Sequence, residues 1–167
     1  MAIVVNMPRE RSNFTIRDTN DRDAAAVAEV VDAAFEPLRT IYQPTRQTIE
    51  RQAIHRNHRN RLIGEADGRM AGTVQYDVHP DRLHAMGLAI HPDYQRMGLA
   101  RLLLQSIEDR ARLTGRPLVV LNTIEETGNV PIFEKLGFQV VSRVVATWCV
   151  STLHSAVHDV TLQRNVS

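Results

Sequence analysis

The sequence predicts a single α/β domain, in which a mixed, mostly antiparallel sheet of six or seven strands carries helices on both faces. The Asp67-Gly68 dipeptide is a strong turn signal, and with the stretches on either side of it, residues 62–65 and 69–78, it indicates an antiparallel hairpin. Farther along the chain, an amphipathic stretch lies between two short apolar runs, which is typical of a strand-helix-strand crossover. The 167 residues are enough for one domain.

Composition excludes several classes of protein. The net charge is +1, from 20 basic and 19 acidic residues, and it favours neither a nucleic-acid binder nor an acidic tail. Cys149 is the only cysteine, which excludes an internal disulfide and a zinc site built on several thiolates. The apolar patch at residues 3–5 is too short for a signal peptide or a membrane span. We therefore expect a soluble, cytoplasmic protein that binds no nucleic acid, membrane or metal.

The N-terminal part is expected to form an arm and then a strand. Residues 1–13 show no periodicity and are predicted to be a flexible arm, followed by the domain proper at residues 14–167. Within that domain, residues 14–17 alternate between apolar and polar side chains, as a first strand would.

Two helices are expected next. Asn20 and the acids that follow it supply a cap and first-turn charges for a helix that Pro37 ends. A second helical stretch runs over residues 46–59. Residues 51–61 hold four arginines, two histidines and no acid, and they could form either a phosphate-binding face or a solvated face. The solvated face is favoured, because no aromatic residues interleave to stack on bases.

The middle of the chain predicts a meander followed by a crossover. Residues 62–65 and 69–78 form the hairpin, and residues 83–90 add a third antiparallel strand. In the helix after Gly98, the apolar residues Leu103, Ile107 and Ala111 share one face. The opposite face is assigned to Arg101, Gln105, Glu108 and Arg112.

The C-terminal part completes the predicted sheet. Residues 118–121 form an uninterrupted apolar run, as expected for a strand that is covered on both faces. A shorter helix is expected over residues 128–137, followed by β-rich stretches at residues 138–148 and 157–164.

The helix that begins at Gly98 has an unusual start. No Ser, Thr or Asp lies next to it to cap it, although a helix start leaves four N–H groups without partners and carries a partial positive charge. A glycine there lets a bulky anion approach the backbone. The start therefore predicts a cradle for a diphosphate, made by the amides of Gln95, Arg96, Met97, Gly98, Leu99, Ala100 and Arg101. The alternative is that Gly98 is an ordinary loop glycine.

Two known phosphate motifs are excluded at this position. No G-K-[ST] follows Gly98, so the loop is not a P-loop, and the three-glycine dinucleotide fingerprint is also absent. What remains is the pattern Q/R-x-x-G-x-G/A after a strand. About thirty residues later, Asn129 to Phe138 read N-V-P-I-F-E-K-L-G-F, which fits the pattern N-x-x-x-Y-x-K-L-G-F.

These two motifs, in this order, resemble those of the GCN5-related N-acetyltransferase (GNAT) family. The resemblance is strong over residues 83–141. It implies the acetyltransferase (GNAT-like) fold, acetyl-CoA as co-substrate, and direct transfer of an acetyl group to a primary amine of a small molecule or a protein N-terminus. Members of the family often form a homodimer.

The resemblance also implies roles for particular residues. The strand residues Leu88, Ala89 and Ile90 would bind the pantetheine arm where this strand separates from the one at residue 118. Asn129 would contact the cofactor, unless it serves as a helix cap, and Phe133 would pack against the pantetheine. The acceptor would be bound by Phe35, Tyr42 and Tyr76, of which Phe35 and Tyr42 are alternatively ordinary core residues.

The predicted catalytic base is His84. Family members often carry a Glu at the position of Asn122, whose amide cannot take a proton. His84 lies on the strand that leads to the cofactor, and an unperturbed histidine titrates near neutral pH. His79 and His91 share this property, whereas Glu65 and Asp77 would act through a water molecule. The alternative for His84 is a structural role.

Phe133 replaces the tyrosine that the family commonly uses as general acid, and its ring cannot donate a proton. One interpretation is that the thiolate leaves without a dedicated acid. Another is that a different tyrosine acts: Tyr42, Tyr76 or Tyr94. A third is that the protein is a catalytically silent acetyl-CoA-binding or sensing module. A nucleophilic role for Cys149 is not favoured, because no activating pair lies near it in the sequence.

Overall fold

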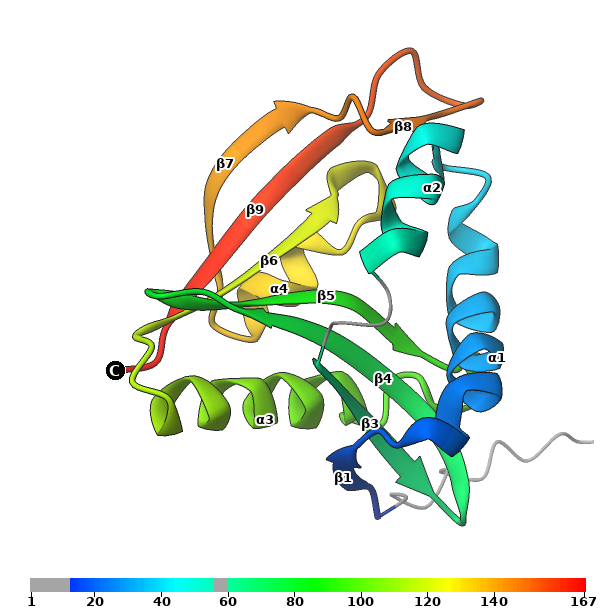
Figure 1. The fold of residues 1–167 in the computed structure, drawn as a ribbon. Helices are drawn as coiled ribbons and strands as arrows, with labels where there is room; N and C mark the ends of the chain where they lie inside the picture. Colours follow the sequence, from blue (N-terminus) through cyan, green and yellow to red (C-terminus); the bar gives the residue numbers. More distant parts are fainter. Residues whose placement is uncertain (1–12, 56–59) are drawn as a thin grey trace, which may run out of the picture.

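A seven-stranded sheet forms the centre of the computed structural model, which describes residues 13–55 and 60–167 (Figure 1). Its strand order is β1-β3-β4-β5-β6-β9-β7, and the only parallel pair in the described sheet is β5 with β6. The bounds are β1 Thr15–Asp18, β3 Asn60–Ala66, β4 Arg69–Val78, β5 Arg82–Ile90, β6 Leu118–Ile124, β7 Gln139–Val145 and β9 His158–Asn165. The predicted mixed, mostly antiparallel sheet is confirmed.

Four α-helices and a small second sheet complete the described chain. The helices are α1 Ala24–Phe35, α2 Arg46–His55, α3 Leu99–Leu113 and α4 Val130–Lys135. The strands β2 Gln43–Pro44 and β8 Cys149–Val150 pair with each other apart from the main sheet. Short 3-10 turns occur at Asp21–Asp23, Glu36–Leu38, Pro92–Tyr94 and Glu125–Thr127. None of the helices in the described ranges is long and apolar enough to cross a membrane.

Some predicted features fall on residues outside the described part. The predicted arm lies there except for Asn13, and so do residues 56–59, which the sequence pattern assigns to the second helix. Most of the basic stretch at residues 51–61 therefore lies outside the described side chains. At its end, Arg61 is part of β3, and its Nη1 donates to Thr73 Oγ1 at 2.9 Å.

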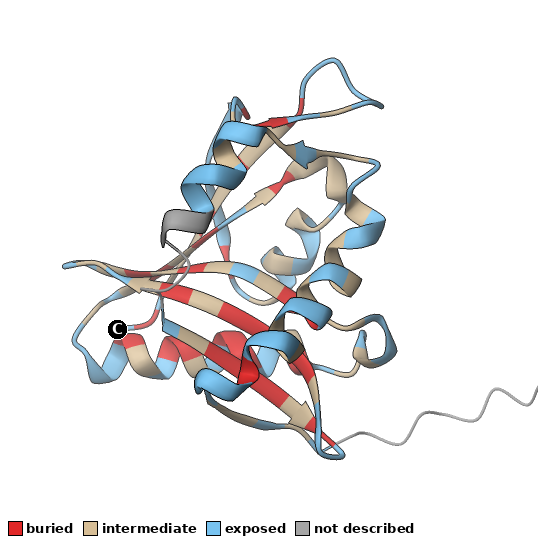
Figure 2. Cartoon of the chain, turned by 45° about the vertical axis from the view of Figure 1, so that its right-hand side comes forward, coloured by how far each residue is buried: buried red, intermediate tan, exposed pale blue. Residues whose placement is uncertain are grey.

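The two faces of the sheet are covered by different helices, as Figure 1 shows for α1 and α3. Alternate strand residues such as Leu62, Val74 and Leu83 are buried in one cluster with the apolar face of α3. Residues of opposite orientation, such as Ile63 and Thr73, are fully buried outside that cluster. Figure 2 shows the buried residues concentrated in these central strands and along α3. The prediction of helices on both faces is confirmed.

Two glycines allow the start of α3 to approach the sheet closely. Gly64 of β3 and Gly72 of β4 are directly opposite each other in the ladder, beneath the first residue of the helix, Leu99. A Cβ on Gly64 would lie 2.5 Å from Leu99 Cδ1, and one on Gly72 would lie 2.9 Å from Leu99 Cδ2. Because Leu99 is fully buried, its side chain has no free space into which to move. Because neither glycine has a side chain, the first turn of α3 can lie close against β3 and β4.

One prediction about α3 is wrong. The sequence pattern places Glu108 on the solvent face, but it is buried, and its carboxylate pairs with Arg164 Nη1 at 3.1 Å and Arg112 Nη2 at 3.6 Å. The helix buries a second side against the turn that follows α4, where Leu136 and Phe138 border the same small hollow as Glu108. A two-sided contact of this kind leaves no separate signal in the periodicity of the helix.

Candidate active site

The parallel strands β5 and β6 separate halfway along their length. They pair over Arg82–Ala85 with residues 118–121, and Ala85 opposite Leu121 is the last pair. Beyond that point β5 continues to Ile90 and β6 continues to Ile124. The predicted separation of the two strands is thus present, and it leaves the second half of β5 without a strand on its β6 side among the described residues.

A β-bulge coincides with this separation. The pairing of β4 with β5 shifts register between Thr73 and Gln75, so that residues 87 and 88 together oppose one residue of β4. Gly87 has φ of 57°, in the left-handed region that glycine adopts without strain. The extra residue in the bulge changes which residues of β5 point to each face of the sheet. As a result, Leu88 and Ile90 face the α3 side together with Leu83. Three residues are predicted to bind the pantetheine arm: Leu88, Ala89 and Ile90. They lie in the part of β5 that pairs with β4 on one side and has no partner on its β6 side, called here the unpaired part of β5.

The start of α3 lies just beyond this strand and has no side-chain cap. Gly98 is the N-cap residue with φ of 86°, and no side chain in the described part of the chain accepts a hydrogen bond from the first turn. Gln95 Nε2 donates to the carbonyl of Ile90 at 3.1 Å, which ties the loop to the end of β5. Arg96 is also left-handed, with φ of 62°, an uncommon conformation for a residue with a side chain. Helix starts that lack a side-chain cap in this way can bind anions through their free amides.

β5 and α4 both contribute half-buried apolar side chains. Leu88 and Ile90 of β5 and Val130 and Phe133 of α4 are half-buried and pack against the α3 cluster. The Phe133 ring makes an edge contact with Phe138, at 6.3 Å between ring centroids. Asn129 is the N-cap residue of α4, but its side chain makes no capping hydrogen bond. Its amide is therefore not used as the helix cap that was the alternative to cofactor contact.

His84 lies on the sheet face opposite α3, where β5 and β6 part. Its Nε2 is 2.9 Å from Oδ1 of Asn122, the first β6 residue beyond the last β5–β6 pair. Burial lowers the pKa of His84 below 6.5, and the hydrogen bond to Asn122 opposes this effect only in part. Burial thus favours the neutral imidazole, which is the form that can accept a proton.

The hydrogen bonds continue from Asn122 across the next strand. Asn122 Nδ2 donates to Asp159 Oδ1 and to Thr161 Oγ1, both at 2.9 Å. Trp148 Nε1 donates to the second carboxylate oxygen of Asp159, Oδ2, at 3.0 Å. Side chains from β5, β6, β9 and the segment before β8 thus form one polar chain from His84 to Trp148.

A shallow hollow of about 380 Å³ opens beside this polar chain. Its lining consists of Asp81, Arg82, His84, Leu118, Val120, Asn122, Thr161 and Gln163. The hollow and the unpaired part of β5 lie on either side of the position where the strands part. A molecule seated in the hollow would reach His84 from the face opposite α3.

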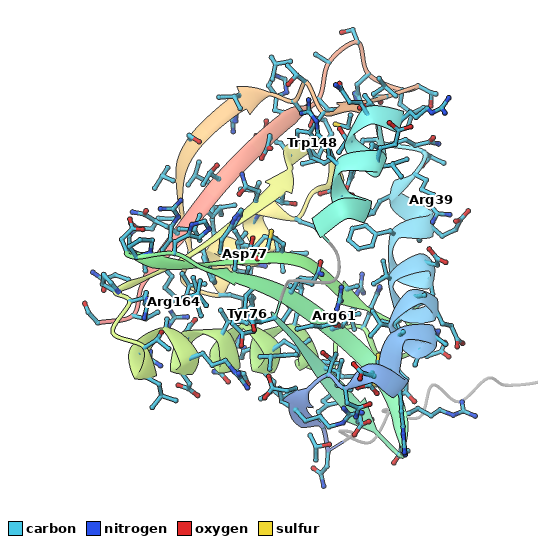
Figure 3. The ribbon with its side chains drawn as sticks, in the orientation of Figure 1. Arg39, Arg61, Tyr76, Asp77, Trp148 and Arg164 are labelled. Atoms are coloured by element: carbon cyan, nitrogen blue, oxygen red, sulfur yellow. The ribbon has the colours of Figure 1, made fainter. Side chains whose placement is uncertain are left out.

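Tyr42 lies at the far end of the polar chain. Its ring makes an edge contact with Trp148 at 5.7 Å between centroids, and Figure 3 shows Trp148 beside α2 at the upper end of the sheet. Burial raises the pKa of Tyr42, and Cys149 and Asp159 raise it further. Phe35, the last residue of α1, is half-buried. Tyr42 thus lies on the same side of the sheet as the hollow, and its role in binding an acceptor stays a prediction.

Tyr76 has a different environment from the one expected. It is buried in the α3 cluster, between the sheet and the helix (Figure 3), and its hydroxyl accepts a hydrogen bond from Nη1 of Arg110, in the half of α3 remote from Gly98, at 2.8 Å. Because β4 alternates its side chains between faces, Tyr76 points away from the face that carries His84. This placement does not support its prediction as an acceptor-binding residue.

Two further groups of residues, a buried cysteine and a cluster of possible metal ligands, are not assigned a catalytic or metal-binding role. Cys149 is buried with Ile124 and Val157, and burial raises the pKa of its thiol, which opposes a nucleophilic role. The side chains of Glu125, Glu126 and His158 bring their ligand atoms within 4.8 Å of one another. His158 Nδ1 already lies 2.7 Å from Glu126, and Arg143 pairs with Glu125, so this cluster is satisfied without a cation.

Sequence reasoning missed three members of the polar chain: Trp148, Asp159 and Thr161. They lie 64 to 77 residues from His84 in the sequence, and their proximity depends on β9 lying between β6 and β7. The alternation of polar and apolar residues in β9 was the available signal. It places Asp159, Thr161 and Gln163 on one face, but it does not say which strand they adjoin.

Comparison with known proteins gives consistent matches. A model of the acetyltransferase (GNAT) family matches residues 26–138. An acetyltransferase of Pectobacterium atrosepticum is 32% identical over 83 residues, which is 48% of this chain and 57% of that protein. The match therefore spans little more than half of that relative's length.

Solved structures share the fold. The ribosomal-protein-S18-alanine N-acetyltransferase of Escherichia coli superposes with a TM-score of 0.75 at 20% identity, over 93% of this chain and 95% of that chain. The structure of yncA from Salmonella typhimurium, solved with its cofactor acetyl-CoA, gives a TM-score of 0.69 at 20% identity over the same shares.

Proposed function

This chain belongs to the acetyltransferase (GNAT) family, and from that premise we propose that it transfers an acetyl group from acetyl-CoA directly to a primary amine. The acceptor is a small molecule or a protein N-terminus. A cytoplasmic location and a homodimer are further predictions from the sequence.

The observation that carries this proposal is the position of the uncapped start of α3 beside the separated strands. The first turn of α3 offers free backbone N–H groups and the positive end of the helix dipole, both of which favour a diphosphate. Going back along β5 from this helix start, Ile90 and Leu88 are half-buried beside the α3 cluster, and His84 lies next to the last residue that pairs with β6. An extended arm with a diphosphate at one end fits this arrangement, because the diphosphate matches the helix start and the arm's amide groups match the strand edge that β6 leaves free.

The residues present fit acetyl-CoA as co-substrate. The amides of residues 98–101 would hold the diphosphate, and the open space in front of Gly98, where an added Cβ would meet no atom within 4 Å, leaves room for it. Leu88, Ile90 and Phe133 would flank the pantetheine arm. Acetyl-CoA supplies an acetyl group activated as a thioester, so no metal or covalent enzyme adduct is needed.

Residues of this chain would take up the proton of the acceptor and stabilise the charge that develops during the transfer. The acceptor nitrogen bonds to the acetyl carbon while the bond from that carbon to sulfur breaks. The neutral imidazole of His84 takes the proton that the nitrogen loses. A backbone N–H in the unpaired part of β5 can donate to the carbonyl oxygen as negative charge develops there. The released thiolate takes up a proton from water, or the proton that His84 has accepted, so that imidazole and thiol both end neutral.

A catalytically silent acetyl-CoA-binding module is the second candidate, favoured by Phe133, whose ring cannot act as an acid. Release of free thiol from acetyl-CoA with a panel of amines separates the two functions. Turnover of any primary amine well above the hydrolysis rate supports the enzyme. Tight binding by calorimetry without turnover of any amine supports the silent module, and absence of binding removes both candidates.

Replacing Gly98 with Glu is expected to weaken acetyl-CoA binding by about tenfold or more, equivalent to about 1.4 kcal/mol. The new carboxylate would lie in front of the amides that hold the diphosphate, where it would both fill the space and repel the anion. Titration calorimetry measures the change.

Gly115 provides a matched control for this substitution. It follows the other end of α3, has φ of 70°, and also has no atom within 4 Å of an added Cβ. Gly115→Glu therefore adds comparable backbone strain without approaching the cradle, and it should retain wild-type affinity. Equal affinities of the two variants would rule out the α3 start as the diphosphate site.

Replacing Phe133 with Tyr is expected to leave acetyl-CoA affinity similar and to raise turnover, because the nearly isosteric ring gains a hydroxyl that can protonate the departing sulfur. Steady-state kinetics at saturating acetyl-CoA tests this. Tyr42→Phe and Tyr94→Phe test the competing idea that another tyrosine already acts as the acid. A loss of roughly 10² in kcat in either variant, with binding unchanged, would show that an acid is already present.

A further inference from the structure

The polar chain that begins at Trp148 has a fixed direction. The indole Nε1 of Trp148 can only donate, so Asp159 Oδ2 must accept from it at 3.0 Å. The other oxygen of this carboxylate, Oδ1, can likewise only accept, and Asn122 lies 2.9 Å from it. Asn122 must therefore turn its NH2 group toward Asp159.

This orientation of Asn122 determines what it offers His84. One proton of Nδ2 is donated to Asp159 and the other to Thr161 Oγ1, at 2.9 Å each, so the amide nitrogen has no donor left for the imidazole. The atom that faces His84 Nε2 at 2.9 Å is the carbonyl oxygen Oδ1, which can only accept. A hydrogen bond between them then requires the proton to be on Nε2.

We infer that Asn122 and Asp159 are positioning residues, which hold neutral His84 in the tautomer with its proton on Nε2 and leave Nδ1 as the nitrogen that takes the proton of the acceptor amine. The inference rests on the proposed function for the role of Nδ1, whereas the tautomer itself is a property of the free protein. A histidine without such a partner exchanges between both tautomers, and only a fraction of it would present the basic nitrogen correctly.

The other polar groups around His84 do not impose a tautomer. The ring of His79 lies 6.3 Å away between centroids, and Asp77 and Arg82 act on the imidazole through their charges, with opposite signs. Within the described ranges, the hydrogen bond to Asn122 is the one that engages the His84 ring. Selection of the tautomer therefore depends on Asn122 and on the carboxylate behind it.

Nitrogen-15 NMR of the imidazole tests this directly, because protonated and unprotonated ring nitrogens have well-separated shifts. The His84 signals are assigned by their absence from His84→Gln. In the wild-type protein, at a pH where His84 is neutral, Nε2 should carry the proton and Nδ1 should give the unprotonated shift. The reverse pattern, or averaged shifts, would overturn the inference without any variant being made.

Asp159→Asn should reverse the pattern. Trp148 still needs an acceptor, so the substituted side-chain amide keeps its oxygen toward the indole and turns its NH2 toward Asn122. Asn122 must then rotate, which places its own NH2 against His84 Nε2 and moves the imidazole proton to Nδ1. The hydroxyl of Thr161 does not resist this rotation, because it can donate as well as accept. Retention of the Nε2 proton in Asp159→Asn would also overturn the inference.

Kinetics on the same variant links the tautomer to the reaction. We expect kcat to fall by roughly 10² in Asp159→Asn, as for removal of a general base, with acetyl-CoA affinity unchanged. Asp109→Asn makes the same chemical change on the exposed face of α3 and should alter neither the shifts nor kcat. Reversed shifts with unchanged kcat would disprove the role of Nδ1. Failure of the wild-type protein to acetylate any amine would disprove the proposed function while leaving the tautomer measurement valid.

Discussion

Replacement of His84 with Gln is expected to lower kcat by roughly 10²- to 10⁴-fold, the usual effect of removing a general base. The glutamine amide can still donate to Asn122 Oδ1, which His84 Nε2 contacts at 2.9 Å, but it cannot take a proton from the acceptor. Affinity for acetyl-CoA should be unchanged, because the cradle at Gly98 is on a separate element. Thiol release measures kcat, and calorimetry measures the affinity.

The pH dependence of the wild-type enzyme adds a second readout. His84 is active when neutral, so the rate falls as pH decreases through its pKa, and burial places that pKa below 6.5. The acidic limb of the pH–rate profile should therefore lie at a lower pH than the pKa of an ordinary histidine would give. The measurement should use an alkoxyamine as the acceptor, because its nitrogen stays neutral in the pH range where His84 titrates. The fall in rate at acidic pH then reports on the enzyme and not on the acceptor. In His84→Gln, the fall in rate at acidic pH should disappear.

His79 is the matched control, because it lies beside His84 but makes no hydrogen bond to Asn122 in the described structure. A positive charge on His79 lowers the pKa of His84, so His79→Gln should keep kcat and move the limb slightly toward higher pH. If His79→Gln lost the limb and His84→Gln kept it, the base would be His79.

Elements with a strong local pattern were predictable from the sequence. The Asp67-Gly68 turn is present with φ of 54° and 73°, as a two-residue hairpin requires, and the meander around it follows. The absence of a cap before Gly98 was visible as the absence of particular residue types, and the structure confirms it. Both features depend on residues that are neighbours in the chain, so local sequence contains all the information needed.

Features that depend on strand order were not predictable. The polar chain from His84 requires Thr161 to lie opposite Asn122, which happens because β9 inserts between β6 and the earlier strand β7. Alternation along β9 gives the same pattern for either position in the sheet. The burial of Glu108 was missed for a similar reason, since a second contact surface on α3 comes from the turn after α4.

Gly64→Ala is expected to destabilise the protein by about 1–3 kcal/mol, as overpacking of a filled core does. The new methyl group would lie 2.5 Å from Leu99 Cδ1, and Leu99 is only 1% exposed, so the start of α3 must move away from the sheet. Because the same turn forms the predicted diphosphate cradle, acetyl-CoA affinity should fall along with the free energy of unfolding. Urea denaturation gives the stability, and calorimetry gives the affinity.

A double-mutant cycle with Leu99→Ala tests whether this one contact is responsible. Leu99→Ala alone should cost about 2–5 kcal/mol through the cavity it leaves, whereas Leu113→Ala, 86% exposed at the other end of α3, should change stability by less than about 0.5 kcal/mol. In the Leu99→Ala background the clash is gone, so Gly64→Ala should add little further destabilisation. If Gly64→Ala had the same cost in both backgrounds, the depth of α3 would not be set by the contact between Gly64 and Leu99. Other contacts between α3 and the sheet would then determine the position of the cradle.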